Sequence, residues 1–346
     1  MSKVYLHLTE VCNMACKYCY MQQLKSRGTR KMSEETAYKA VDYMAQDKRW
    51  GVETIIFFGG EPMLEQGMIE TVTGYINKEY PGQFNLSMIT NGTLLTQNFI
   101  DFAEENNISI VLSYDGMYGP RNRVSEDGKE LLVINTDWIK ESCISALSVI
   151  DTTNVRYLHD NVKHLREVGF KRIQHVTNYD GEWNMDLLEI LRDEWEKITE
   201  DYINWKKAGE EISLARLEGM VQSYARRFIL DDMPEFRPLM GISVTGEIYP
   251  YPGAIGNEAL WLGDVFTGFD EEKVNKLKVL PKVDACAGCD ILDICPSAKG
   301  NILTDNLQPH SHRVSCESYK IMVDCAEEVL EKLLYANLEE HNDKIL

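Results

Sequence analysis

Short apolar runs alternate with amphipathic segments through the first half of the chain. The strand-length runs cover residues 4–8, 53–58, 84–89, 108–113, 143–150 and 172–177. Helical periodicity marks residues 33–48, with Ser33 as candidate N-cap, and residues 65–79, 96–106 and 155–168. This alternation predicts an α/β fold of parallel strands connected by helices, a sheet or barrel with its site at the carboxyl ends of the strands.

The second half of the chain has a different pattern. Residues 183–230 are charged and helical in period, which predicts two bridging helices with Trp183, Trp195 and Trp205 as packing residues. A hairpin signature follows at residues 241–249, then a cysteine-rich loop at 286–300 and a helix at 315–334. We therefore expect a barrel domain at residues 1–183, bridging helices at 184–233 and an accessory domain at 234–346.

Composition narrows the setting. The chain has 346 residues and a net charge of −19, which disfavours nucleic acid as a partner, although the acidity could equally serve solubility. The first residues lack the apolar stretch of a secretory signal, and no apolar run approaches a membrane span. We expect a cytoplasmic protein without membrane contact. In that reducing compartment its nine cysteines indicate metal binding or catalysis rather than disulfides.

Three cysteines lie directly after the first expected strand. Cys12, Cys16 and Cys19 have the spacing C-x3-C-x2-C. Three thiolates can hold three irons of a 4Fe–4S cube and leave the fourth iron without a protein ligand. The alternatives for such a triplet are a zinc site or core cysteines.

The end of the second expected strand carries a second motif, Gly59-Gly60-Glu61-Pro62. With the cysteine triplet upstream, the first half of the chain resembles the radical S-adenosylmethionine (AdoMet) superfamily. The resemblance implies that Cys12, Cys16 and Cys19 hold the catalytic cluster and that AdoMet chelates its open iron and yields a 5′-deoxyadenosyl radical. It also implies that Gly59, Gly60 and Glu61 hold the AdoMet amino group. A carboxylate suits an ammonium, and glycine permits close approach of the backbone.

Further AdoMet contacts follow from the same resemblance. It assigns ribose and carboxylate contacts to the tips of the third and fourth strands, although Asn-Gly and Asp-Gly turns explain those tips equally well. Arg121 competes with Arg123 for the AdoMet carboxylate, and the aromatic residues on either side of Cys19 are expected near the cofactor. The additional expected cofactor-binding residues are Tyr18, Tyr20, Thr90, Asn91, Ser113, Asp115 and Arg123.

A second cysteine set lies in the last third of the chain, at Cys286, Cys289, Cys295 and Cys316. Four thiolates form a closed set with no vacant iron. The spacing resembles the SPASM and Twitch domains of sulfatase-maturating and peptide-modifying members of the superfamily, which implies an auxiliary 4Fe–4S cluster. A structural zinc site is the alternative. The leftover cysteines, Cys143 and Cys325, are expected to be packing residues.

The full SPASM pattern places a further cluster on three other cysteines. This chain has Tyr251, Lys299 and the segment 236–238 at those positions, so we expect one auxiliary cluster only. Where sulfatase-maturating enzymes carry a catalytic aspartate, this chain has Pro252. That departure argues against formylglycine formation. Tyr251 then either contacts substrate or fills the vacated space.

Together these features predict a partial (β/α)6 TIM-type barrel with a C-terminal SPASM/Twitch-like iron–sulfur domain. We expect an oxidoreductase that modifies a peptide by hydrogen abstraction followed by crosslinking or dehydrogenation, with the auxiliary cluster accepting or relaying an electron. A flavodoxin or ferredoxin would donate electrons, and because the chain begins at strand one, a separate protein could recognise the peptide. His175 and Asn178 are further substrate-facing candidates.

Two other functions remain open. One is a small-molecule dehydrogenase of the Twitch type. The other, from a different class, is a non-catalytic iron–sulfur electron carrier or a metal-stabilised interaction protein. The Gly59–Pro62 motif disfavours that last class, because an electron carrier needs no AdoMet site.

Overall fold

The computed structural model divides the chain into two compact units. Unit 1 comprises Met1–Ser113, Arg121–Ile144 and Arg237–Leu280, and unit 2 comprises Tyr114–Pro120, Ser145–Phe236 and Pro281–Leu346. The residues that the structure describes are 2–23, 28–47, 51–119, 121–125, 127–128, 136–141, 144–227, 239–278, 286, 288–295 and 309–335. Cys143, Lys299 and the segment 236–238 lie outside these ranges.

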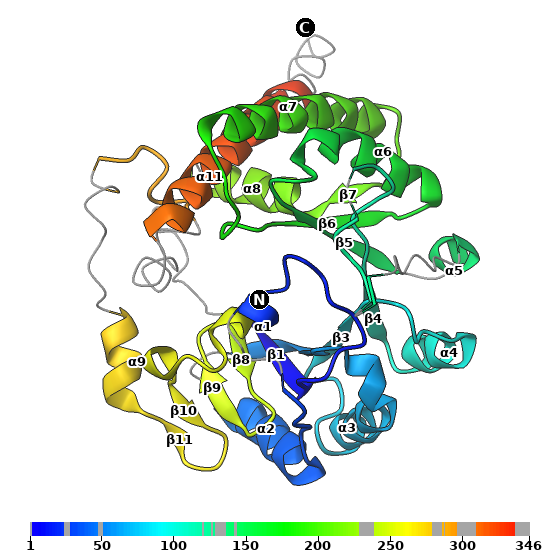
Figure 1. Ribbon diagram of the computed structural model, residues 1–346, viewed down its shortest axis with the longest axis vertical. Coiled ribbons are helices and arrows are strands. Elements are labelled where there is room, and N and C mark those ends of the chain that lie inside the picture. The colour runs from blue at the N-terminus through cyan, green and yellow to red at the C-terminus, as the bar shows by residue number, and fades with distance from the viewer. Residues whose placement is uncertain are drawn as a thin grey trace, which may run out of the picture. The chain divides into compact units, whose positions relative to one another are not determined.

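Unit 1 is built on one sheet in the order β11-β10-β9-β8-β1-β2-β3-β4. β1 pairs parallel with β2 on one side and with β8 on the other, and Figure 1 shows β8 next to β1. The antiparallel β8–β9 hairpin confirms the predicted one, and β10 and β11 extend it. The strands are β1 (Ser2–Thr9), β2 (Val52–Gly59), β3 (Asn85–Thr90), β4 (Ile108–Ser113), β8 (Leu239–Ile242), β9 (Glu247–Tyr249), β10 (Gly263–Asp264) and β11 (Gly268–Phe269).

The two faces of this sheet differ in character. Val4, Leu6 and Leu8 of β1 are fully buried, and Val4 and Leu6 pair in register with buried residues of β2. The opposite face carries partly exposed side chains such as Tyr5 and Phe58, whose rings meet edge to face. Strand alternation therefore gives unit 1 an apolar core on one face and a mixed surface on the other.

Helices alternate with the strands of unit 1. They are α2 (Glu34–Gln46), α3 (Gln66–Glu79) and α4 (Gln97–Glu105), with shorter helices α1 (Tyr20–Gln23), α5 (Thr136–Glu141) and α9 (Glu271–Lys278). Ser33 caps α2 as predicted, because its side chain accepts a hydrogen bond from the Thr36 N–H at 3.1 Å. Thr96 caps α4 in the same way.

Unit 2 contains the strands β5 (Ser145–Ile150), β6 (Arg172–Thr177) and β7 (Ser213–Leu214), which pair parallel in that order. Its helices are α6 (Leu158–Val168), α7 (Met185–Lys207), α8 (Ala215–Arg226) and α11 (Pro309–Leu330), and α11 packs on both α7 and α8. The two bridging helices predicted from the sequence are α7 and α8. Trp195 is buried in α7, which confirms its packing role.

All six strands predicted in the first half are present as β1–β6, and they run parallel within each unit. The parallel pairing of β8 with β1 was not predicted. The division into residues 1–183, 184–233 and 234–346 remains a proposal. Within the described ranges, no helix is both long and apolar enough to cross a membrane.

Candidate functional site

The loop after β1 carries the first cysteine set. Backbone hydrogen bonds hold it against a neighbouring segment: the Ala15 N–H donates to the Val124 carbonyl at 2.7 Å, and the Lys17 N–H to the Asn122 carbonyl at 2.9 Å. Cys12, Cys16 and Cys19 form no disulfide and are partly exposed. The loop is therefore fixed through its backbone while its thiols stay accessible to a ligand.

Gly59 and Gly60 let the ends of β1 and β2 approach closely. Gly59 has a φ of +128°, and a Cβ there would overlap the Thr9 carbonyl oxygen. A Cβ on Gly60 would overlap the Val11 carbonyl in the same way. The Gly60 N–H donates to the Thr9 carbonyl at 2.8 Å. The sequence suggested that these glycines make room for a ligand, but the contact that requires them here is with the protein backbone.

Glu61 is only 1% exposed and lies between the ends of β2 and β3. Its Oε1 accepts hydrogen bonds from the Thr90 hydroxyl at 2.6 Å and the Met63 N–H at 3.1 Å, and its Oε2 accepts one from the Asn91 N–H at 2.8 Å. Burial raises the pKa of Glu61, and these three bonds act in the opposite direction. A carboxylate can accept about four hydrogen bonds, so Glu61 retains capacity for one further donor.

Asn13 connects the cysteine loop to the tip of β3. Its Oδ1 accepts a hydrogen bond from Asn91 Nδ2 at 2.8 Å, and its Nδ2 donates to the Thr93 hydroxyl at 2.8 Å. The Thr93 hydroxyl in turn donates to Asn91 Oδ1 at 2.7 Å, which closes a ring of three side chains. Asn13 is not among the site residues predicted from the sequence. Its position directly after Cys12 was the available signal, because an amide can donate and accept at once.

The aromatic residues beside Cys19 also belong to this loop. The Arg123 guanidinium lies over the Tyr18 ring, 5.4 Å from its centroid, a cation–π arrangement. Tyr20 begins α1, and burial, with smaller contributions from Cys19 and Tyr5, raises its pKa well above the usual value. The two tyrosines expected near AdoMet thus lie on the same loop as the cysteines, and Arg123 stacks on one of them.

Ser113 and Asp115 fall in different units. Ser113 ends β4 and is partly exposed, whereas Asp115 belongs to unit 2. There Asp115 Oδ1 accepts a hydrogen bond from the Val149 N–H of β5 at 2.9 Å. All the other expected AdoMet contacts belong to unit 1. Asp115 therefore has a structural partner, and the nearby Asp-Gly turn is real, since Gly116 has a φ of +106°.

The second cysteine set lies in unit 2. Burial is the main cause of a raised pKa at the Cys316 thiol, and Cys289 and Cys295 raise it further, so both of these thiols lie within electrostatic reach of Cys316. The Cys289 N–H donates to the Cys286 carbonyl at 3.2 Å, within the same turn. An all-thiol set of this kind fits an iron–sulfur cluster or zinc.

The spacing of the thiols bears on that choice of metal. In a 4Fe–4S cube each thiolate binds a different iron, so the sulfurs stand further apart than the ligands of a single zinc ion. Across the ranges that the structure describes, no three His, Cys, Asp or Glu side chains are arranged to hold one metal ion. The assignment of a cluster to each cysteine set is therefore a proposal.

Comparison with known families decides the general identity. Residues 6–193 match the radical SAM superfamily, which is more than half of the chain. The chain belongs to the radical SAM superfamily. It is therefore an enzyme that uses AdoMet with a 4Fe–4S cluster, and its fold is the α/β partial barrel of that superfamily.

Its relatives include several radical SAM proteins. An uncharacterized protein of Methanocaldococcus jannaschii is 29% identical over 50% of this chain and 61% of its own length. The cyclopropyl synthase TigE of Paramaledivibacter caminithermalis is 24% identical over 55% of this chain and 41% of its own. The serine-type anaerobic sulfatase-maturating enzyme of Bacteroides thetaiotaomicron is 26% identical over 52% and 48%. The chain thus spans roughly half the length of these curated relatives.

Solved structures are similar over a larger share of this radical SAM protein. Native anSMEcpe with bound AdoMet has a TM-score of 0.71 at 18% identity and covers 96% of this chain and 98% of its own. SuiB of Streptococcus suis, bound to its precursor peptide SuiA, has a TM-score of 0.61 at 17% identity and covers 89% and 74%. At these identities the likeness concerns the fold.

Pro252, the residue that argued against formylglycine formation in the sequence, lies just after the β8–β9 hairpin. Pro252 begins a short 3₁₀ turn, Pro252–Ala254. A Cβ on Gly241 of β8 would come within 2.9 Å of the Pro252 Cα, so the turn packs tightly on the sheet. Gly253 lies between the rings of Tyr251 and Tyr20. Pro252 carries no group that could accept a substrate proton.

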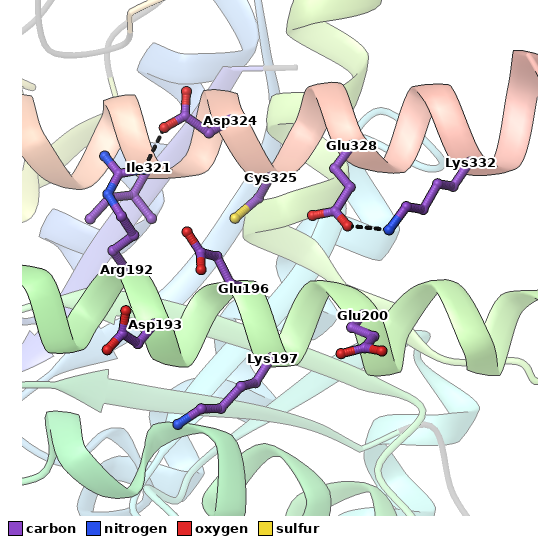
Figure 2. A pocket seen from close by; sticks show the side chains of 10 residues that line it. All are labelled: Arg192, Asp193, Glu196, Lys197, Glu200, Ile321, Asp324, Cys325, Glu328 and Lys332. Atoms are coloured by element: carbon purple, nitrogen blue, oxygen red, sulfur yellow. Dashed lines mark hydrogen bonds and ion pairs between the residues drawn. The ribbon is translucent and has the colours of Figure 1, made fainter.

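A cavity of about 590 Å³ lies between α7 and α11 in unit 2 (Figure 2). Cys325 projects into it from α11 but is only 2% exposed, and burial, only partly opposed by the nearby Thr199 hydroxyl, raises the pKa of its thiol to about 11. Its burial agrees with the packing role predicted for it. Ion pairs join Arg192 to Asp324 and Lys332 to Glu328 at 2.5 Å each. None of the expected AdoMet or cluster residues lines this cavity.

His175, one of the two further substrate-facing candidates, is buried within unit 2. It shares the buried face of β6 with Ile173 and Thr177, and its ring meets Trp195 of α7 edge to face at 5.3 Å. It is 5% exposed, and neither ring nitrogen has a hydrogen-bond partner among the described residues. Burial, with a smaller effect of Arg216, lowers the pKa of His175 to about 3, so the ring is neutral. These contacts fit a structural role, which is the more common one for a single histidine at the end of a strand.

Proposed function

We propose that this radical SAM enzyme modifies a peptide substrate by removing hydrogen from an unactivated carbon, followed by crosslinking or dehydrogenation. The observation that carries the proposal is the pair of separate cysteine sets, one on the loop after β1 and one between the 286–295 loop and α11. A single cluster suffices to cleave AdoMet. A second, closed set indicates an additional redox group, as in the peptide-modifying SPASM enzymes that the sequence resembles.

The first site is assigned to AdoMet and its cluster. Cys12, Cys16 and Cys19 would hold three irons. When bound, AdoMet and this cluster supply the radical that removes hydrogen from the substrate. The remaining acceptor capacity of Glu61 suits the AdoMet ammonium. Tyr18 and Tyr20 would border adenine.

Other residues of the first site would orient AdoMet. Gly59 and Gly60 would do so through their backbone, and Thr90, Asn91, Ser113 and Arg123 would contact the ribose and the carboxylate. Asn13 fixes the cysteine loop relative to Asn91 and Thr93, and so relative to the strand tip that receives the cofactor.

The second site is assigned to one auxiliary 4Fe–4S cluster held by Cys286, Cys289, Cys295 and Cys316. The electrostatic proximity of three of these thiols supports the assignment. A one-electron donor of the flavodoxin or ferredoxin type would supply the electrons that AdoMet cleavage consumes.

Two structural relatives support a peptide as the substrate class. anSMEcpe has been solved with AdoMet and the Cp18Cys peptide, and SuiB with its precursor peptide SuiA. The net charge of −19 favours a neutral or basic peptide over an acidic one.

The test is co-expression with short peptides encoded beside the gene, followed by mass spectrometry of each peptide. We expect a loss of mass equal to removed hydrogen, and no loss with Cys12→Ala. Cys325→Ala is the matched control, because it removes a thiol that belongs to neither cysteine set. A protein that forms 5′-deoxyadenosine with small alcohols or amines but alters no peptide would instead be the small-molecule dehydrogenase.

A further inference from the structure

Arg216, near the start of α8, connects the end of β6 to α11. Its guanidinium donates hydrogen bonds to three hydroxyls, those of Thr177 at 3.2 Å, Tyr179 at 3.0 Å and Ser318 at 2.9 Å. It also lies over the Tyr319 ring, 5.3 Å from its centroid. Its Nε is buried without a hydrogen-bond partner. The cation is thus held in one place by neutral groups.

Arg216 differs from its basic neighbours in its lack of a counter-ion. Arg227, at the end of α8, pairs with Asp293 at 2.9 Å, and Lys320 of α11 pairs with Glu317 at 3.0 Å. Among the described residues, no carboxylate lies within ion-pair distance of Arg216. Hydroxyl groups satisfy N–H donors but do not neutralise a charge. A partly buried guanidinium without an anion is costly, so a nearby negative group is expected.

The second cysteine set contributes one thiol, Cys316, to the helix that Arg216 contacts. Ser318 and Tyr319, which both contact Arg216, follow Cys316 by two and three residues on α11, and this separation is less than one helical turn. Burial is the main cause of the raised pKa of Tyr319, Tyr179 raises it further, and the Arg216 cation lowers it, as its position over the ring requires. Arg216 therefore contacts α11 at the two residues that follow Cys316 by two and three positions.

We propose that Arg216 is the counter-charge of the auxiliary cluster and raises its reduction potential. This inference rests on the proposed assignment of that cluster to Cys286, Cys289, Cys295 and Cys316. A cube bound by four thiolates is anionic and gains another negative charge on reduction, so a fixed cation favours the reduced state. Arg216 acts through the electrostatic field and is a positioning residue, since it binds neither substrate nor iron.

The experiment measures the auxiliary cluster alone. A protein with Cys12, Cys16 and Cys19 changed to Ala, reconstituted anaerobically, is titrated with reductant and followed by electron paramagnetic resonance. Arg216→Gln should lower the ratio of reduced to oxidised cluster about tenfold at a fixed solution potential. This corresponds to a fall of about 59 mV in the reduction potential of a one-electron couple. Arg216→Lys retains the charge and should stay near the parent value. Arg192→Gln, which removes a cation already paired with Asp324, is the control and should cause no shift.

A second pair of variants leaves Arg216 in place. Ser318→Asp puts a carboxylate next to the guanidinium and should shift the potential in the same direction as Arg216→Gln, whereas the neutral Ser318→Asn should not. Two results, with iron content unchanged, would overturn the electrostatic role of Arg216 and leave the cluster assignment intact. One is an equal potential for Ser318→Asp and Ser318→Asn, and the other is an equal shift for Arg216→Lys and Arg216→Gln. Failure of the triple-alanine parent to bind iron and sulfide would overturn the auxiliary cluster itself, and the role of Arg216 with it.

Discussion

At the scale of single residues, several residues of the site already make contacts within the protein that the fold requires. Glu61 accepts three hydrogen bonds from its own chain. Gly59 and Gly60 accommodate the backbone after β1. A residue can therefore be required for both the fold and the cofactor, and substitutions must be chosen to separate the two.

Glu61→Gln tests the cofactor role of this carboxylate. The amide nearly preserves the shape but loses the negative charge and one acceptor oxygen. We expect AdoMet affinity to fall tenfold or more, since a charge-assisted hydrogen bond is worth about 1.5–3 kcal/mol. Anaerobic binding titrations measure this. Iron content should be unchanged, and Glu65→Gln, at a carboxylate paired with Lys31 at 2.6 Å, should leave the affinity as it was. Unaltered AdoMet binding in Glu61→Gln would show that the Gly59–Pro62 motif serves only as a turn.

Pro252 leads to a prediction about a reaction that should not occur. A general base must lie within about 3 Å of its proton or act through one water, and proline offers no acceptor side chain. We expect no formylglycine on a sulfatase-type Cys or Ser peptide, even while 5′-deoxyadenosine accumulates. Mass spectrometry for the aldehyde decides the matter. Substantial aldehyde would mean that another residue supplies the base.

His175 should make stability depend on pH. Its pKa is about 3 in the folded protein, whereas an unfolded histidine titrates near 6.5. Between these values only the unfolded chain binds the proton, so the stabilisation is fully present above pH 6.5 and is lost as the pH falls toward 3. From pH 6.5 to pH 5 the free energy of unfolding should drop by about 2 kcal/mol for this residue.

Denaturant unfolding at the two pH values tests this with a neutral replacement. Between pH 6.5 and pH 5, the free energy of unfolding of His175→Gln should fall by about 2 kcal/mol less than that of the parent protein. Identical pH dependence in both proteins would show that the ring is protonated in the folded state.

At the scale of elements, the cysteine loop is fixed from two sides. Backbone hydrogen bonds join it to the segment 121–125, and Asn13 joins it to the tip of β3. A loop without regular secondary structure thus acquires a defined position from its neighbours. This matters because the thiols must keep a fixed spacing if they are to hold three irons.

Asn13→Ala should loosen this loop without removing a thiol. We expect weaker AdoMet binding, on the order of tenfold, because two side-chain hydrogen bonds of about 1 kcal/mol each are lost. Binding titrations under anaerobic conditions measure the effect. Thr93→Ser keeps the hydroxyl and should bind AdoMet like the parent. If Asn13→Ala matched the parent, the amide ring would have no role in cofactor binding.

The same elements show what the sequence could reveal. Short apolar runs predicted β1–β6, and the spacing of the cysteines indicated all seven candidate ligands. Both patterns can be recognised along the sequence without knowing how distant segments meet. The contacts of Asn13 with Asn91 and Thr93 depend on how distant segments meet, so no local pattern records them. The face of His175 was hard to predict for a related reason: β6 carries an apolar residue on each side, Ile173 on one and Val176 on the other.

At the scale of the whole molecule, the two cysteine sets belong to different compact units. We expect about eight irons per reconstituted chain, four in each cube-type cluster. Changing Cys12, Cys16 and Cys19 to Ala should remove about half of the iron and abolish AdoMet cleavage. Iron, sulfide and zinc analyses check this, with Cys325→Ala as the control. About four irons together with one zinc in the parent protein would contradict the two-cluster assignment.

The position of β1 has a consequence for how the protein folds. Lys3 pairs with Leu239, so one side of β1 is completed by a strand that the ribosome makes long after it. Until β8 emerges, that side exposes unpaired N–H and C=O groups, which other chains could bind as an edge strand. Contacts so distant in sequence also slow folding. Nascent chains that stop before residue 239 should therefore aggregate through β1, and the first cysteine loop, which continues from β1, can reach its final form only when synthesis is well advanced.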